Sequence, residues 1–185
     1  MSRDRRSRTV SRLLAALLAC SFVGASREPT ELEVKAAFLY HFAQLVTWPE
    51  PANVDPAAPV VIGVVGRDPF GDRLEETIGR ELVRGRPLRI VRAATAVDLV
   101  PAPQILFVGA GDLAEVSRSL AALGNAPVLT VGSVKGFAQQ GGMIEFRVTA
   151  DSRVAFDINV VAVEASGLKM SSQLLKIARI VRAAR

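Results

Sequence analysis

Side chains that could carry out acid–base, nucleophilic or metal chemistry are few in this sequence. His41 is the only histidine and Cys20 the only cysteine among the 185 residues. The motifs H-E-x-x-H, C-x-x-C and G-x-S-x-G do not occur, so metal hydrolysis and nucleophile–histidine catalysis lack their necessary groups. The acidic side chains of Glu75 and Glu76 lie on the surface of a predicted helix, where they are solvated and not arranged for catalysis. The sequence therefore predicts no catalytic residues, no metal site and no cofactor.

The segment from Gly66 to Asp72 is a loop that could hold an anion at the start of a helix. It follows the apolar run 60–65, but its glycines match neither the P-loop nor the G-x-G-x-x-G pattern. A tight strand-to-helix connection is the simpler interpretation, with Asp68 as the N-cap, Pro69 as the first helical residue and Gly79 as the end of the helix. The alternative is a small-ligand pocket that uses this loop.

Asn159 is the second candidate for such a pocket. It follows a strand and precedes a short predicted helix that ends at Gly167, so it equally suits the N-cap of that helix. Ser171 and Ser172 likewise suit the cap of the last helix. Capping is the favoured interpretation for all three residues, and ligand binding by Asn159 remains the alternative.

The last third of the chain is predicted to form a hairpin followed by a helix. The runs 144–148 and 154–158 alternate apolar and polar residues with period two, and the turn-forming residues 149–152 separate them, which predicts an antiparallel hairpin. Leu174, Leu175, Ala178 and Val181 then recur at helical spacing, which predicts an amphipathic helix to the C-terminus.

The earlier part of the chain supplies the rest of a sheet. A capping box, Thr30 with Glu33, begins a helix that Trp48-Pro49 ends. The fold class predicted is α/β: a single domain, residues 26–185, with a mixed, mostly parallel sheet, helices on both faces, and the C-terminal β-hairpin and amphipathic helix. Apolar strands are expected at 60–65, 88–92, 104–108 and 128–131, with a helix from Asp112 to Leu123.

Residues 1–25 have the pattern of a secretory signal peptide. An arginine-rich start is followed by an apolar run that is too short to cross a bilayer core of roughly 30 Å, and the segment ends in Val23-Gly24-Ala25. Leu17 to Cys20 approximates a lipoprotein cleavage box, so lipidation at Cys20 is the alternative. The segment carries five of the 23 basic residues and one of the 18 acidic ones, which leaves a mature charge of about +1. This balance predicts no nucleic-acid partner.

Six segments in order resemble the YfiR family, over about residues 31–182. They are Glu31–Pro49, the loop Gly66–Gly71, Ile105–Val108, Leu129–Val131, Gly136–Ala138 with Gly141–Ile144, and Phe156–Asn159 through Leu168–Leu175.

This resemblance implies a secreted, non-enzymatic α/β protein of the periplasm. The best-known member represses a membrane-bound diguanylate cyclase by binding its periplasmic sensor domain, and it tends to dimerise. Many relatives carry a cysteine two residues before the strand Ile105–Val108, where this chain has Pro103, so redox control by a disulfide is not expected here.

The leading hypothesis is a periplasmic regulator that binds and represses an inner-membrane signalling protein. The alternative is a periplasmic small-molecule-binding or transport accessory protein. Trp48, Pro49 and Phe70 lie at the ends of elements, where bulky side chains can serve as exposed anchors for a partner, although packing in the core is the alternative for Trp48. A homodimer is also expected. The last helix, with Ile177 and Ile180, is its candidate seam because it is apolar over more than one face.

Overall fold

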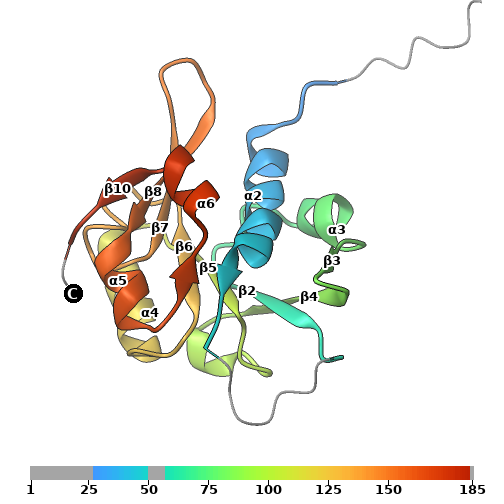
Figure 1. Ribbon diagram of the computed structural model, residues 1–185, viewed down its shortest axis with the longest axis horizontal. Coiled ribbons are helices and arrows are strands. Elements are labelled where there is room, and N and C mark those ends of the chain that lie inside the picture. Colours follow the sequence, from blue (N-terminus) through green and yellow to red (C-terminus); the bar gives the residue numbers. More distant parts are fainter. Residues whose placement is uncertain (1–26, 50–56, 184–185) are drawn as a thin grey trace, which may run out of the picture.

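A computed structural model describes residues 27–49 and 57–183 (Figure 1). Its centre is an eight-stranded sheet with the order β10-β8-β7-β6-β5-β2-β4-β3. Within this sheet, β7–β8 and β3–β4 are antiparallel and the other described pairs are parallel, so the expectation of a mixed, mostly parallel sheet is confirmed. The strands are β2 (Val60–Gly66), β3 (Leu82–Val83), β4 (Arg86–Ala93), β5 (Ile105–Gly109), β6 (Leu129–Gly132), β7 (Ile144–Val148), β8 (Val154–Asn159) and β10 (Arg179–Val181).

The strand order reverses in the middle of the sheet. The chain leaves β2 toward β4 on one side, crosses back to β5 on the other side of β2, and then continues outward to β6. The loops that follow β2 and β5 therefore turn in opposite directions. In open α/β sheets such a switch point leaves a crevice at the carboxyl ends of the two strands.

One face of the sheet is covered by α2 (Glu31–Leu45), α3 (Arg73–Ile78), α5 (Val160–Ala165) and α6 (Ser172–Ile177) (Figure 1). The capping box of Thr30 and Glu33 is present at the start of α2. The helix ends at Leu45, earlier than expected, because β1 (Val46–Thr47) continues as an extended segment that pairs with β9 (Lys169–Met170). Phe42 packs against Phe146 and Phe156, which fastens α2 to the hairpin.

The other face is covered by α4 (Leu113–Leu123), the 3₁₀ turn η1 (Ala96–Asp98) and the turn that precedes β7. Val116 and Leu120 of α4 pack here on Leu106 and Val108 of β5. Neighbouring residues of β5 thus face opposite cores, as the uninterrupted apolar run of a parallel strand requires. Helices on both faces were expected and are confirmed.

The hairpin β7–β8 forms with the expected turn, and Phe146 lies opposite Phe156. Its polar side is nevertheless partly buried, because the turn before β7 packs on it and β10 extends the sheet beside β8. Glu145 is buried and accepts hydrogen bonds from the backbone N–H groups of Gly136 and Ala138, at 3.1 and 3.0 Å. Asp157 is fully buried and accepts from Arg147 and Arg179. These two carboxylates hold neighbouring segments in place instead of facing solvent.

The expectation of an amphipathic helix to the C-terminus is wrong beyond Ile177. Helix α6 ends there, and β10 extends the sheet as a parallel edge strand in which Arg179 pairs with Asp157. The side chains of these two residues also form an ion pair, which helps to hold β10 beside β8. Asn159 also holds this segment in place. Its amide group donates to the carbonyl oxygen of Ala183 at 2.9 Å and accepts from the N–H of Ala183 at 3.4 Å.

The expected signal peptide, residues 1–25 with Cys20, lies outside the described residues. Within the described ranges, no helix combines the length and the apolar character that a bilayer crossing requires.

Two glycines allow the loops at the switch point to touch. Gly66 has φ of +74°, and a Cβ atom on it would lie 2.8 Å from the carbonyl oxygen of Gly109. A Cβ atom on Gly109 would overlap the carbonyl oxygen of Arg67. The two loops therefore approach closely, and the N–H of Arg67 donates a hydrogen bond to the carbonyl oxygen of Gly109 at 2.6 Å. The pair therefore fixes how the ends of β2 and β5 meet.

We expect Gly109→Ala to lower the free energy of unfolding by about 1–3 kcal/mol, the usual cost of overpacking, because its new methyl group meets backbone that cannot rotate away. Urea denaturation monitored by circular dichroism measures the change. Gly111→Ala is the matched control, since a Cβ atom there would make only ordinary contacts of 3.5 and 3.9 Å with side-chain atoms. Equal stability of the two variants would contradict this view of the glycine contact.

Candidate functional site

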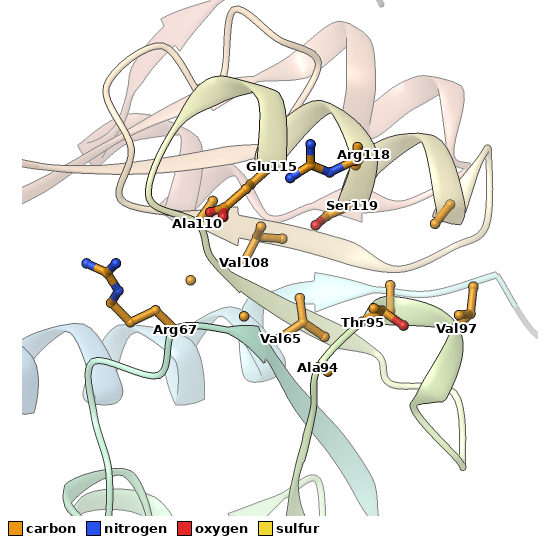
Figure 2. A pocket seen from close by; sticks show the side chains of 14 residues that line it. Val65, Arg67, Ala94, Thr95, Val97, Val108, Ala110, Glu115, Arg118 and Ser119 are labelled. Carbon is orange, nitrogen blue, oxygen red and sulfur yellow. The ribbon is translucent and has the colours of Figure 1, made fainter.

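An open cleft of about 520 Å³ lies at the carboxyl ends of β2 and β5, where the strand order reverses (Figure 2). We call it the switch-point cleft. Its floor is apolar, with Val65 and Val108 both buried, and η1 and α4 form its two walls. The residues that line it are Val65, Gly66, Arg67, Ala94, Thr95, Ala96, Val97, Val108, Gly109, Ala110, Glu115, Arg118, Ser119 and Ala122.

Two arginines supply the positive charge of the switch-point cleft. Arg67 follows β2 at one end of the cleft, and Arg118 extends along α4 above the floor (Figure 2). Both are exposed, and among the described residues neither guanidinium has a hydrogen bond or an ion pair. Ser119, on the same wall as Arg118, presents a hydroxyl group toward the cleft (Figure 2).

The one carboxylate that lines the cleft is engaged in shaping it. Glu115 accepts a hydrogen bond from the N–H of Gly111 at 2.6 Å, and its own N–H donates to Asp112 at 2.9 Å. Asp112 is thus the N-cap of α4, but Glu115 reaches back one residue beyond the position that a capping box requires. These bonds fix the loop between β5 and α4 at the edge of the cleft.

Asp68 lies in the loop after β2, but it does not cap a helix as expected. Its side chain accepts a hydrogen bond from the N–H of Phe70 at 2.7 Å, which makes a local turn, and α3 begins later, at Arg73. The other oxygen of Asp68 accepts from Arg92 of β4 at 2.7 Å. Asp68 therefore ties its loop to the sheet.

Arg92 also binds Glu75 and the carbonyl oxygen of Gly71, and so gathers the whole loop onto β4. Hydrogen bonding to Arg92 lowers the pKa of Glu75 below its ordinary value, and Glu75 in turn raises the pKa of Arg92. Because the folded-state pKa of Glu75 is lowered, its contribution to stability is complete above the unfolded-state pKa and is lost as the pH falls through the folded-state value. Glu75 is largely solvated, so this contribution is small.

Phe70 is not an exposed anchor. It is 1% exposed, and its ring packs edge-on against Phe107, with 4.8 Å between the ring centroids. The reason is the turn made by Asp68, which directs the backbone of the loop so that the next aromatic side chain enters the core.

Trp48 and Pro49 lie together at the opposite, amino ends of the parallel strands. Trp48 is half-buried and its indole N–H donates to the carbonyl oxygen of Gln104 at 3.1 Å, whereas Pro49 is exposed. Both line a second cleft of about 640 Å³. The structure thus brings these two predicted anchors together and separates them from Asp68 and Phe70.

Asn159 belongs to neither cleft. It is 0% exposed, caps α5 by accepting from the N–H of Ala162, and donates to the carbonyl oxygens of Ala138 and Ala183. The favoured interpretation as a helix cap is confirmed. The alternative of a pocket shared by this residue and the loop after β2 does not fit the structure, since β7, β6 and β5 separate β8 from β2.

Sequence reasoning missed Arg67, Arg118 and Ser119. The available signal was the position of Arg67 directly after an apolar strand that ends in glycine, a feature shared by Ala110 after β5. Its significance depends on the strand order, which places those two strand ends side by side. Among the described residues, no group of three or more His, Cys, Asp or Glu side chains is close enough to hold a metal ion.

Comparison with curated proteins gives no match. A crystal structure from Vibrio cholerae O1 biovar El Tor, titled a conserved domain protein, is similar with a TM-score of 0.54 at 14% sequence identity. The match covers 82% of this chain but only 60% of the other, and at this identity it shows the fold alone. A family model described as YfiR/HmsC-like matches residues 32–179. The resemblance found in the sequence is therefore confirmed, and this chain belongs to the YfiR/HmsC-like family.

Proposed function

We propose that this chain is a non-enzymatic regulatory protein of the periplasm that binds the periplasmic part of an inner-membrane signalling protein, a diguanylate cyclase, and represses it. The observation that carries the proposal is the family match over residues 32–179. The YfiR/HmsC-like family is periplasmic and regulatory, which supports the general role. The cyclase as target and repression as the outcome are the specific content of the proposal.

The use of the buried acids fits a binding protein. Glu145 and Asp157 are the buried carboxylates of the described residues, and both are hydrogen-bonded to backbone or paired with arginine. They hold segments of the fold together, which is a structural role and not that of a catalytic acid or base. His41 lies exposed on α2 beside Tyr40.

Repression would work through a shift in the partner's conformational populations. A protein that binds one state of a cyclase more tightly than another shifts the equilibrium by that difference in affinity. Moving the partner from almost fully active to almost fully inactive needs a preference of about 10⁴-fold. Such a preference requires contact with a surface of the partner that differs between its states.

Trp48 and Pro49 are the proposed anchors of that contact. Both line the second cleft, and Pro49 offers an exposed apolar surface beside the partly exposed indole of Trp48. Aromatic residues at the edge of a cleft are common among the residues that dominate binding energy. Because Trp48 also packs on the core, a test needs a second variant that leaves this packing intact.

We expect Trp48→Ala and Pro49→Glu each to weaken capture of the membrane partner by roughly 30-fold, the effect of losing a strong anchor. Capture of detergent-solubilised inner-membrane proteins by the mature chain, quantified by mass spectrometry, measures the effect. Melting temperatures show whether either variant has lost stability. Pro69→Glu places the same change on an exposed proline at the opposite ends of the strands and should capture normally. Normal capture by a well-folded Pro49→Glu variant would place the contact elsewhere.

We also propose a homodimer formed along the β10 edge of the sheet. Ile177 at the end of α6 is 65% exposed and Ile180 of β10 is 39% exposed, so apolar side chains flank an edge strand whose outer backbone groups are open to another strand. Two-fold dimers are the commonest oligomers.

Sedimentation equilibrium of the mature chain at micromolar concentration should give the mass of two chains. Ile177→Glu should give a monomer with an unchanged melting temperature, because this side chain packs on little of its own chain. Leu82→Glu, on the strand at the other edge of the sheet, is the control and should remain dimeric. A monomeric native chain would refute the dimer. Dissociation caused by Leu82→Glu alone would show that the dimer forms at the β3 edge and not at the β10 edge.

A periplasmic small-molecule-binding or transport accessory protein is the second candidate function. The switch-point cleft favours it, because its volume falls within the range of about 300–1,000 Å³ that is usual for ligand pockets. The neighbouring genes discriminate between the two: a membrane cyclase or sensor kinase supports regulation, and a transporter supports the accessory role.

A further inference from the structure

We propose that the switch-point cleft binds a small organic anion, a carboxylate or phosphate ester attached to a flat apolar body. The inference stands on the cleft itself and does not depend on the identity of the protein partner. It follows from the two arginines of the cleft, its apolar floor and its position in the sheet.

The switch-point cleft carries an excess of positive charge, because its two arginine side chains lack partners. Arg92, Arg147 and Arg179 each pair with a carboxylate, and Arg84 and Arg86 donate to backbone carbonyl oxygens. In the described part of the chain, Arg67 and Arg118 do neither, and unlike Arg80 and Arg89, which also lack such partners, they line the same cleft. Glu115 removes one of the two charges, so a net positive charge remains for an anion of charge −1 or −2.

The start of α4 does not itself provide the anion site. The N–H of Glu115 donates to Asp112, and the N–H of Gly111 donates to Glu115. Recognition therefore depends on the guanidinium groups, with the Ser119 hydroxyl as an additional donor from the α4 wall (Figure 2). The hydroxyl of Thr95 on the other wall is already donated to Asp98 at 2.6 Å. The anionic group is thus expected on the α4 side of the cleft.

The rest of the cleft matches an apolar body. Val65 and Val108 form the floor, and the η1 wall consists mainly of alanine and valine side chains. Val97 on that wall is 71% exposed, so it offers apolar surface at the side of the cleft. A flat apolar group lying on the floor would cover this side chain while its anionic end meets the arginines.

Four probes separate the contributions of charge and apolar surface: naphthalene-2-carboxylate, 2-naphthyl phosphate, the neutral naphthalene-2-carboxamide, and inorganic phosphate. Calorimetric titration of the mature chain measures affinity, and amide chemical shifts locate the site. We expect both aromatic anions to bind at millimolar concentration or below. The carboxamide should bind at least about tenfold more weakly, as loss of one charge-assisted hydrogen bond implies. Inorganic phosphate should also bind at least about tenfold more weakly, because it buries no apolar surface on the floor. The tighter of the two anions identifies the natural ligand as a carboxylate or a phosphate ester.

Matched variants test the location. Arg67→Gln and Arg118→Gln should each weaken the aromatic anions about tenfold. Arg89→Gln, which alters an exposed arginine of β4 outside the cleft, should leave affinity unchanged. Ala122→Trp should fill the cleft and abolish binding, whereas Ala121→Trp, one residue away and not lining the cleft, should not. Equal affinity for the carboxamide, equal loss in Arg89→Gln, or no binding at millimolar concentrations would each overturn the proposal, whatever the outcome of the partner capture.

Discussion

The contact between Gly66 and Gly109 is the constraint on which the arrangement of the molecule depends. It brings the carboxyl ends of the two central strands together at the point where the chain reverses direction across the sheet. No side chain can occupy either position without displacing backbone. The loop after β2 can then turn toward β4, where Arg92 holds it, and the loop after β5 can turn toward α4. A cleft between the two loops follows from this divergence, and the two central strands supply its apolar floor.

Most of the fold could be predicted from local patterns, and the exceptions share one physical cause. Apolar runs and capping residues identify β2, β5, α2 and α4 because these signals lie within a few neighbouring residues. The alternation around Glu145 and Asp157 correctly predicts a hairpin, but it wrongly suggests that its polar side faces water. Those acids are buried through partners distant in sequence, Gly136 and Arg179 among them. The residues expected at the end of the last helix instead form β10, where Arg179 pairs with Asp157. Local periodicity does not reveal such a pairing.

The candidate site was less predictable than the fold. Asp68, Phe70 and Asn159 were identified by residue type and position, yet the structure uses all three for internal contacts. Trp48 and Pro49 do lie together at a cleft, because the break between helix and loop places bulky residues at an element end. Arg67 and Arg118 are ordinary surface arginines in the sequence. Only the strand order, which brings both of them to one cleft, distinguishes them from other exposed arginines such as Arg89.

The two clefts lie at opposite ends of the same parallel strands, so an anion in one and a protein partner at the other would be connected through β2 and β5. This arrangement suits a regulator that responds to a small molecule, but repression of a membrane cyclase is the claim on which the physiological role depends. The most direct measurement is the cellular concentration of cyclic-di-GMP after deletion of the gene, and after its replacement by an exported or a leaderless chain. We expect the concentration to rise on deletion and to return to its original value only with the exported chain. An unchanged concentration on deletion would contradict repression of a cyclase.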